Sequence, residues 1–220
     1  MRVEFPPHES KLSLEGPAGK LEAIVTPPKV GVEESGIFAV VCHPHSLMGG
    51  TMNNKVVHTV ARMHRDSGGS VARFNFRGVE GSEGEYDEGV GETDDLLAVL
   101  EWANEVKPND RLWIIGFSFG SYVSARTVNA ALEKGLPVEQ LILIAPAVEN
   151  YDFESWNRFG VPVGIIMGDA DEVVDPEAMR GWIDGVKSER KVQVIEGAGH
   201  FFHGRLGDLK VALQDVVSCD

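Results

Sequence analysis

The chain contains only two cysteines among its 220 residues, Cys42 in an apolar segment and Cys219 near the C-terminal end. Two cysteines so placed form neither a disulfide framework nor the ligand spacing of a zinc site. A sequence of this kind is typical of a reducing compartment, and we therefore expect a cytoplasmic protein.

The sequence also lacks a long hydrophobic run. The first residues, 1–9, contain no apolar segment of signal-peptide length, and no later segment approaches the roughly 18 apolar residues of a membrane helix. We therefore expect a protein that is neither exported by a signal peptide nor inserted in a membrane.

Basic residues are few: 20 Lys and Arg stand against 34 Asp and Glu, which gives a formal net charge of −14 at pH 7. Nucleic-acid binding depends on clustered Lys and Arg, so a nucleic-acid partner is not expected. What the chain does have is 43% hydrophobic residues, enough for a sizeable core. A chain of this length and composition predicts a single domain over residues 1–220.

Short apolar runs alternate with helical patterns along the chain. The expected strands are 12–15 and 21–26, joined as an antiparallel hairpin, then 37–42, 70–74, 112–115, 141–145, 163–167 and 192–195. The expected helices begin at Asn53 or Asn54, include Leu96 to Ala103, follow Ser118, and span 176–186 and 205–217. This alternation predicts an α/β fold with a mostly parallel central sheet, an N-terminal antiparallel hairpin and helices on both faces. Ligands of such folds bind beyond the carboxyl ends of the strands.

Gly116-Phe117-Ser118-Phe119-Gly120 directly follows the apolar run 112–115 and precedes a helical pattern. A strand that ends in G-x-S-x-G holds the serine in a strained turn and leaves its hydroxyl accessible at the edge of the sheet. Side chains at the two glycine positions would collide with the neighbouring strand and helix. The placement therefore predicts Ser118 as a nucleophile.

Acyl transfer to a serine needs a base and a group that orients the base. Several carboxylates follow the strand 163–167; Asp171 is preferred as the orienting acid, and Asp169 is the alternative, since some of these acids cap the next helix. A glycine-rich loop beyond the last strand carries His200, the preferred base, and His203, the alternative. Serine, acid and histidine then each follow a separate strand.

A hole for the oxyanion requires two backbone N–H groups. The residue after the nucleophile, Phe119, supplies one, because its amide lies at a helix N-terminus. The second is expected from the loop after the strand 37–42, which begins His43-Pro44-His45. Because Pro44 has no N–H, the amide of His45 is the expected donor.

Taken together, these segments resemble the small α/β-hydrolase fold serine hydrolases of the esterase and dienelactone-hydrolase-like kind, over nearly the whole chain. The motifs that carry the resemblance are His43-Pro44-His45, Asn75-Phe76-Arg77-Gly78 with Gly81-Ser82 and Gly84, the turn at Ser118, Gly168-Asp169-Ala170-Asp171 and Gly199-His200-Phe201-Phe202. The resemblance implies Ser118 as nucleophile, His200 as general base and then acid, and Asp171 as the residue that holds the imidazole tautomer. Many relatives have His-Gly where this chain has His43-Pro44.

The chain has only about 16 residues between the strand ending near 145 and the one beginning near 161. Relatives with a lid insert it here, and this segment is too short for a cap domain. We therefore expect an open, shallow pocket that favours small or accessible acyl groups. Phe117, Phe119, Tyr151 and Phe201 are candidates to line it, with ordinary core packing as the alternative.

Arg77 follows a strand and is a candidate to face an acidic substrate. An ion pair with Glu80, Glu83 or Glu85 is the simpler alternative. The glycines near Arg77 do not form G-x-G-x-x-G at the start of a helix, so they do not indicate a dinucleotide site.

The leading hypothesis is a serine hydrolase that cleaves small carboxylic esters through an acyl-enzyme, without a cofactor or metal. Thioesters and activated amides are alternatives, because one mechanism serves all three. A metal-dependent hydrolase built on the H-x-H pair of His43 and His45 is weaker, since no further ligand set completes a first coordination shell. A non-catalytic ligand-binding module on the same fold is the remaining alternative.

Overall fold

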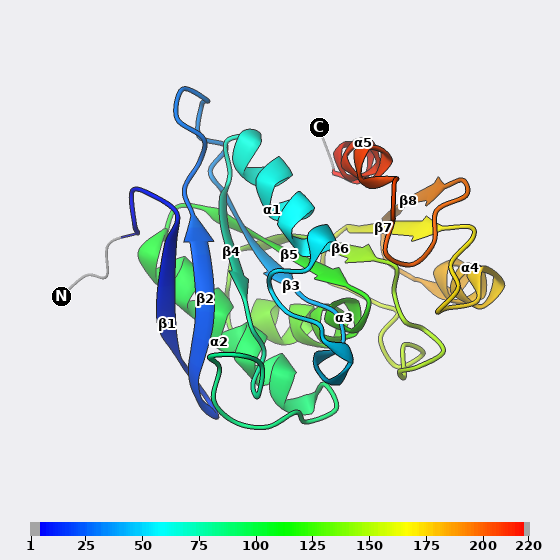
Figure 1. Cartoon of the computed structure of the whole chain (residues 1–220), viewed down its shortest axis with the longest axis horizontal. Coiled ribbons are helices and arrows are strands. Elements are labelled where there is room, and N and C mark those ends of the chain that lie inside the picture. The colour runs from blue at the N-terminus through cyan, green and yellow to red at the C-terminus, as the bar shows by residue number, and fades with distance from the viewer. Residues whose placement is uncertain (1–4, 218–220) are drawn as a thin grey trace.

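The computed structural model describes residues 5–217 of the chain, so Cys219 lies outside the described residues. An eight-stranded sheet with the order β1-β2-β4-β3-β5-β6-β7-β8 runs through the centre of the molecule (Figure 1). Its strands are β1 (Ser10–Gly16), β2 (Gly19–Thr26), β3 (Ile37–Cys42), β4 (Ser70–Phe74), β5 (Arg111–Phe117), β6 (Val138–Ile144), β7 (Val163–Gly168) and β8 (Arg190–Ile195).

The sheet is mostly parallel, as the alternation of strands and helices predicts. Strands β1 and β2 pair antiparallel as a hairpin closed at Gly16 and Gly19, and β2 pairs antiparallel with β4. Every pair from β4 through β8 is parallel. The carboxyl ends of β3, β5, β7 and β8 therefore meet at one edge of the sheet, where the predicted functional loops begin.

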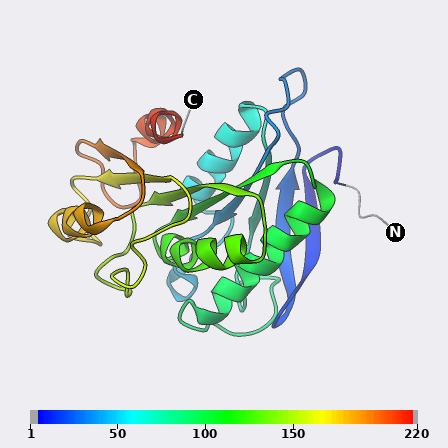
Figure 2. The same cartoon turned by 180° about the vertical axis from the view of Figure 1, so that it is seen from behind.

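Helices cover both faces of the sheet (Figures 1 and 2). On one face, α2 (Val90–Val106), α3 (Phe119–Glu133) and α4 (Pro176–Gly185) contribute Leu96, Val123 and Met179 to a large apolar cluster. On the other face, α1 (Lys55–Asp66) and α5 (Leu206–Val216) contribute Val57 and Leu213 to a second cluster. The central strands β3 and β7 are almost continuously apolar and buried from both sides, whereas β1 and β8 at the two edges of the sheet are largely exposed.

Local signals fix the ends of the helices. The Asn54 side chain accepts a hydrogen bond from the Val56 N–H and caps α1, and Gly68 follows α1 with a φ of 88°. Residues 145–162 contain neither helix nor strand, so the fold carries no cap there. No helix within residues 5–217 has the length and apolar character needed to cross a membrane.

Candidate active site

Ser118 lies between β5 and α3 in a backbone conformation that few residues adopt, with φ 55° and ψ −117°. The flanking glycines make this turn sterically possible. A Cβ at Gly116 would lie 2.2 Å from the Gly120 carbonyl oxygen, and a Cβ at Gly120 would lie 2.6 Å from the Cys42 carbonyl oxygen. Because these neighbours are backbone atoms, any side chain would force the turn to move. The sequence motif therefore reflects close packing of the turn against β3.

Three side chains from distant parts of the chain form a continuous hydrogen-bonded series at this turn. Ser118 Oγ lies 2.9 Å from His200 Nε2, and His200 Nδ1 lies 2.8 Å from Asp171 Oδ2. A carboxylate accepts only, so Nδ1 carries the imidazole proton and Nε2 is free to accept the Ser118 proton. This is the protonation pattern that a serine nucleophile needs.

Asp171 is held by the loop that follows β7. Its Oδ1 accepts hydrogen bonds from the N–H groups of Val173 at 2.8 Å and Val174 at 2.9 Å. Burial favours the neutral acid, but the hydrogen bonds from His200 and Val174 outweigh burial and lower the pKa of Asp171. The carboxylate therefore stays ionised beside the imidazole at neutral pH.

The alternative residues lie elsewhere. The Asp169 carboxylate accepts a hydrogen bond from the Gly197 N–H at 2.5 Å, which ties the β7 loop to the β8 loop. The His203 ring packs against Phe201 at 5.8 Å between ring centroids. Glu172, which sequence reasoning did not single out, accepts a hydrogen bond from the His200 backbone N–H at 3.0 Å. The structure thus brings Asp171 and His200 to Ser118, and not Asp169 or His203.

The two expected oxyanion donors flank the same space. The Phe119 amide begins α3, and His45 immediately precedes the 3-10 turn η1 (Ser46–Met48). Neither N–H has an acceptor within residues 5–217. The rings of His45 and Phe119 lie 5.4 Å apart, so the two loops are in contact. The two amides therefore remain the expected oxyanion donors.

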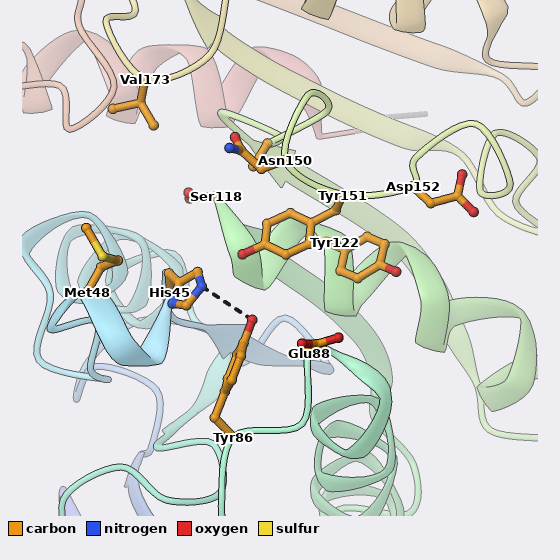
Figure 3. Close-up of a pocket in the computed structure, with 11 residues that line it drawn as sticks. His45, Met48, Tyr86, Glu88, Ser118, Tyr122, Asn150, Tyr151, Asp152 and Val173 are labelled. Carbon is orange, nitrogen blue, oxygen red and sulfur yellow. Dashed lines mark hydrogen bonds between the residues drawn. The ribbon is translucent and has the colours of Figure 1, made fainter.

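The His45 side chain supports the loop that carries its amide. Its Nδ1 accepts a hydrogen bond from the Leu47 N–H at 3.1 Å, which places the ring proton on Nε2, 3.3 Å from the Tyr86 hydroxyl (Figure 3). Burial lowers the pKa of His45, which is consistent with this neutral form. Tyr86 was missed in the sequence because it lies in an irregular loop without periodicity.

His43 is wholly buried and directly follows β3, at the same edge of the sheet. Its Nδ1 donates to the Pro44 carbonyl oxygen at 2.6 Å, and its Nε2 accepts from the Phe76 N–H at 3.0 Å. Burial lowers the pKa of His43 to about 4, so the ring is neutral. Both ring nitrogens are used inside the protein, and the H-x-H pair therefore does not present a metal site. Across residues 5–217, no group of three or more His, Cys, Asp or Glu side chains is arranged to hold a metal ion.

A pocket of about 680 Å³ opens at Ser118. His45 and Ser118 line it together with Tyr86, Glu88, Tyr122 and Tyr151 (Figure 3). Tyr151 is therefore placed as the sequence predicts. Tyr86, Glu88 and Tyr122 were not singled out, since nothing in their spacing distinguishes them.

Three expected lining residues are placed differently. Phe119 is fully buried and lies outside the pocket lining. Phe117 is only 1% exposed and packs inward, with its ring 5.4 Å from His200 and 5.9 Å from Phe201, so it is a core residue and does not line the pocket. Phe201 packs between Phe117 and His203 and also lies outside the lining. Both rings pack against the imidazole of His200, at 5.4 Å and 5.1 Å between ring centroids.

Arg77 also differs from expectation. Its guanidinium binds Asp95 of α2 through two hydrogen bonds, at 3.0 Å and 2.7 Å, and neither side chain reaches the pocket lining. The predicted partners Glu80, Glu83 and Glu85 are wrong, because Asp95 satisfies the guanidinium from the helix that follows the loop. Arg77 is therefore engaged in holding the loop and is not available to an acidic substrate.

Comparisons with known proteins give the family. No family model matches this chain. The chain is 34% identical over 212 residues to an uncharacterized protein of Rickettsia prowazekii (strain Madrid E), a match that covers 91% of this chain and 85% of that protein.

Two solved structures have a higher sequence identity to this chain than that protein has. An α/β serine hydrolase without a lid from Xanthomonas campestris is 44% identical, with a TM-score of 0.89 and coverage of 96% of this chain and 94% of that one. An α/β serine hydrolase homologue from Coxiella burnetii is 41% identical, with a TM-score of 0.89 and coverage of 97% and 100%. The expected α/β-hydrolase fold without a cap is thereby confirmed. The chain belongs to the lidless α/β serine hydrolases.

Proposed function

We propose that this hydrolase cleaves small carboxylic esters through an acyl-enzyme, with Ser118 as nucleophile, His200 as general base and acid, and Asp171 as the orienting carboxylate. The observation that carries the proposal is the series of hydrogen bonds from Ser118 through His200 to Asp171, at 2.9 Å and 2.8 Å. The strained turn at Ser118 supports it, because such turns are held in place where a nucleophile must be displayed.

In the acylation step, Ser118 Oγ forms a bond to the ester carbonyl carbon while its proton moves to His200 Nε2. The negative charge that develops on the carbonyl oxygen is stabilised by the N–H groups of Phe119 and His45. The imidazolium then gives its proton to the alcohol oxygen as the bond between carbon and that oxygen breaks. Asp171 stabilises the imidazolium throughout and is not itself protonated.

Water completes the cycle. His200 takes a proton from a water molecule, whose oxygen attacks the acyl carbon on Ser118. The same two amides stabilise the second tetrahedral intermediate. When it collapses, the Ser118 oxygen recovers a proton from His200 and the carboxylic acid leaves. The absence of a cap over residues 145–162 supports this step, because the pocket is open to solvent.

The test is turnover of p-nitrophenyl esters from acetate to octanoate. We expect a burst of p-nitrophenol equal to one molecule per protein, followed by slower release limited by deacylation, and faster turnover of the short esters. Ser118→Ala should abolish the burst. Ser155→Ala, in the exposed loop before β7, is the matched control and should keep it. Ligand binding without turnover of any ester would instead favour a non-catalytic binding module.

A further inference from the structure

The pocket at Ser118 gathers all three tyrosines of the chain. Tyr122 and Tyr151 stack at 4.7 Å between centroids with an interplanar angle of 18°, and Tyr86 lies across the pocket beside His45 (Figure 3). The Tyr86 hydroxyl is hydrogen-bonded to His45, and the Tyr122 hydroxyl accepts from Arg126 at 2.9 Å. Those two hydroxyls therefore already have partners within the protein, and the three tyrosines line the pocket beside them.

Carboxylates accompany these rings. Glu88 and Asp152 both line the pocket, and its lining contains no Lys or Arg. Glu88 is exposed and has no hydrogen bond or ion pair within residues 5–217. Burial raises the pKa of Tyr86, and the carboxylates of Glu92 and Glu88 raise it further. The charged side chains that line the pocket are therefore acidic, in a chain whose formal net charge is −14.

The arginines near this wall do not line the pocket. Arg77 is bound to Asp95 through two hydrogen bonds. Arg126 contacts the ring of Tyr122 at 5.4 Å and does not line the pocket. His45 is neutral, since its Nδ1 accepts a backbone hydrogen bond. The Tyr122 ring is stacked on Tyr151 and already faces Arg126, so a ligand cation would meet the rings of Tyr86 and Tyr151 and the unpaired carboxylate of Glu88.

We propose that the pocket selects esters with a positively charged ammonium group on the alcohol or acyl part, placed against the rings of Tyr86 and Tyr151 and attracted by Glu88. Esters that carry a negative charge are rejected by the same field. The inference rests on the proposed esterase function, and it adds the substrate class. The expected charge of the substrate is thereby opposite to that of the acidic substrate that an unpaired Arg77 would have favoured.

Three acetate esters of similar size test the charge preference. They are acetylcholine, its uncharged isostere 3,3-dimethylbutyl acetate and the anionic 3-acetoxypropane-1-sulfonate, followed by acid release at constant pH. We expect kcat/KM for acetylcholine to exceed that of the uncharged ester about tenfold, from a cation over aromatic rings and one nearby carboxylate. The anion should be at least about threefold slower than the uncharged ester. Raising the ionic strength should reduce both ratios, because exposed charges are screened.

Charge-neutralising variants locate the effect. Glu88→Gln should reduce the ratio of acetylcholine to the uncharged ester about threefold. The matched control is Glu105→Gln, which makes the same change of charge near the C-terminal end of α2, whereas Glu88 precedes its N-terminal end. Glu105 lies roughly 20 Å along the helix from Glu92 in the first turn, at about 1.5 Å per residue. Its ratio should equal that of the unmodified protein.

The outcomes separate this inference from the proposed function. If the uncharged ester is hydrolysed and acetylcholine is no faster, the charge preference is wrong and the esterase function stands. If no ester is hydrolysed, the proposed esterase function is wrong, and the preference for a cation is then tested by ligand binding. In that case, saturation-transfer NMR should detect phenyltrimethylammonium on the unmodified protein and a weaker signal with Glu88→Gln. Equal signals from phenyltrimethylammonium and benzenesulfonate would overturn the preference.

Discussion

Replacing Asp171 by asparagine should disable the imidazole without disturbing the fold. The N–H groups of Val173 and Val174 both point at Asp171 Oδ1, so an asparagine there keeps its carbonyl oxygen toward them. Its NH₂ group then faces His200 Nδ1, which must accept a hydrogen bond and so loses its proton to Nε2. Nε2 can no longer take the Ser118 proton.

The expected loss in kcat/KM is about 10⁴-fold, the size of effect seen when a triad histidine is held in the wrong tautomer. This corresponds to about 5 kcal/mol of transition-state stabilisation. The free energy of unfolding should change by less than about 1 kcal/mol, because the hydrogen bonds to the backbone of the loop are retained. A large kinetic effect without a stability effect is the signature of the tautomer mechanism.

The assay is kcat/KM for p-nitrophenyl acetate, together with urea unfolding of the same samples. Asp169→Asn is the matched control; its carbonyl oxygen can still accept from the Gly197 N–H, so activity should fall by no more than about threefold. Retention of more than a tenth of the activity by Asp171→Asn, or an equal loss in Asp169→Asn, would refute the reasoning.

Three further predictions concern stability. Burial lowers the pKa of His64 from 6.5 to about 4, so the free energy of unfolding should fall by about 3 kcal/mol from this group as the pH falls from 6.5 to 4. In urea unfolding, His64→Gln should lose about 3 kcal/mol less than the unmodified protein over this range, and an identical pH dependence would contradict the prediction. Gly120→Ala places a Cβ 2.6 Å from the Cys42 carbonyl oxygen, and we expect a loss of about 3 kcal/mol by urea unfolding, where an unchanged midpoint would argue against close packing of the turn. Asp95→Ala leaves the Arg77 guanidinium without its carboxylate and should lower the free energy of unfolding by about 3 kcal/mol. A decrease in Tm of less than about 2 °C would contradict this prediction.

Most of the fold could be predicted because its signals are local. Strand β3 is a continuous apolar run bounded by turn residues, and both β3 and β4 occur at the predicted bounds, Ile37–Cys42 and Ser70–Phe74. The position of Ser118 follows from the glycines around it, which must lack side chains. Parallel strands then bring the loops after β7 and β8 to the same edge, and this explains why Asp171 and His200 could be named from chain order.

The remaining features depend on contacts between irregular segments. Asp169 and Asp171 follow the same strand two residues apart, and only the turn of the loop directs one to His200 and the other to Gly197. The partner of Arg77 lies on the next helix, and no spacing rule identifies it. Phe117 and Phe119 were candidates for the pocket with core packing as the alternative, and the backbone on either side of Ser118 directs both rings into the core.

Residues from the loop between β4 and α2 were missed for a related reason. Tyr86 and Glu88 lie in a segment without periodicity, where side-chain direction depends on individual backbone angles, such as the φ of 52° at Glu88. Their role at the pocket could be found only once the loop was placed beside His45. The aromatic and acidic character of the pocket is therefore a property of the folded loop.

The most direct test of the central claim is covalent labelling of the intact protein with a fluorophosphonate, followed by mass spectrometry. The unmodified protein should gain one phosphonyl group, located on the peptide that contains Ser118, and Ser118→Ala should gain none, while Ser155→Ala labels as the unmodified protein does. His200→Ala should label far more slowly, because the serine then has no base. An unlabelled native protein, or a label that persists in Ser118→Ala, would contradict the account.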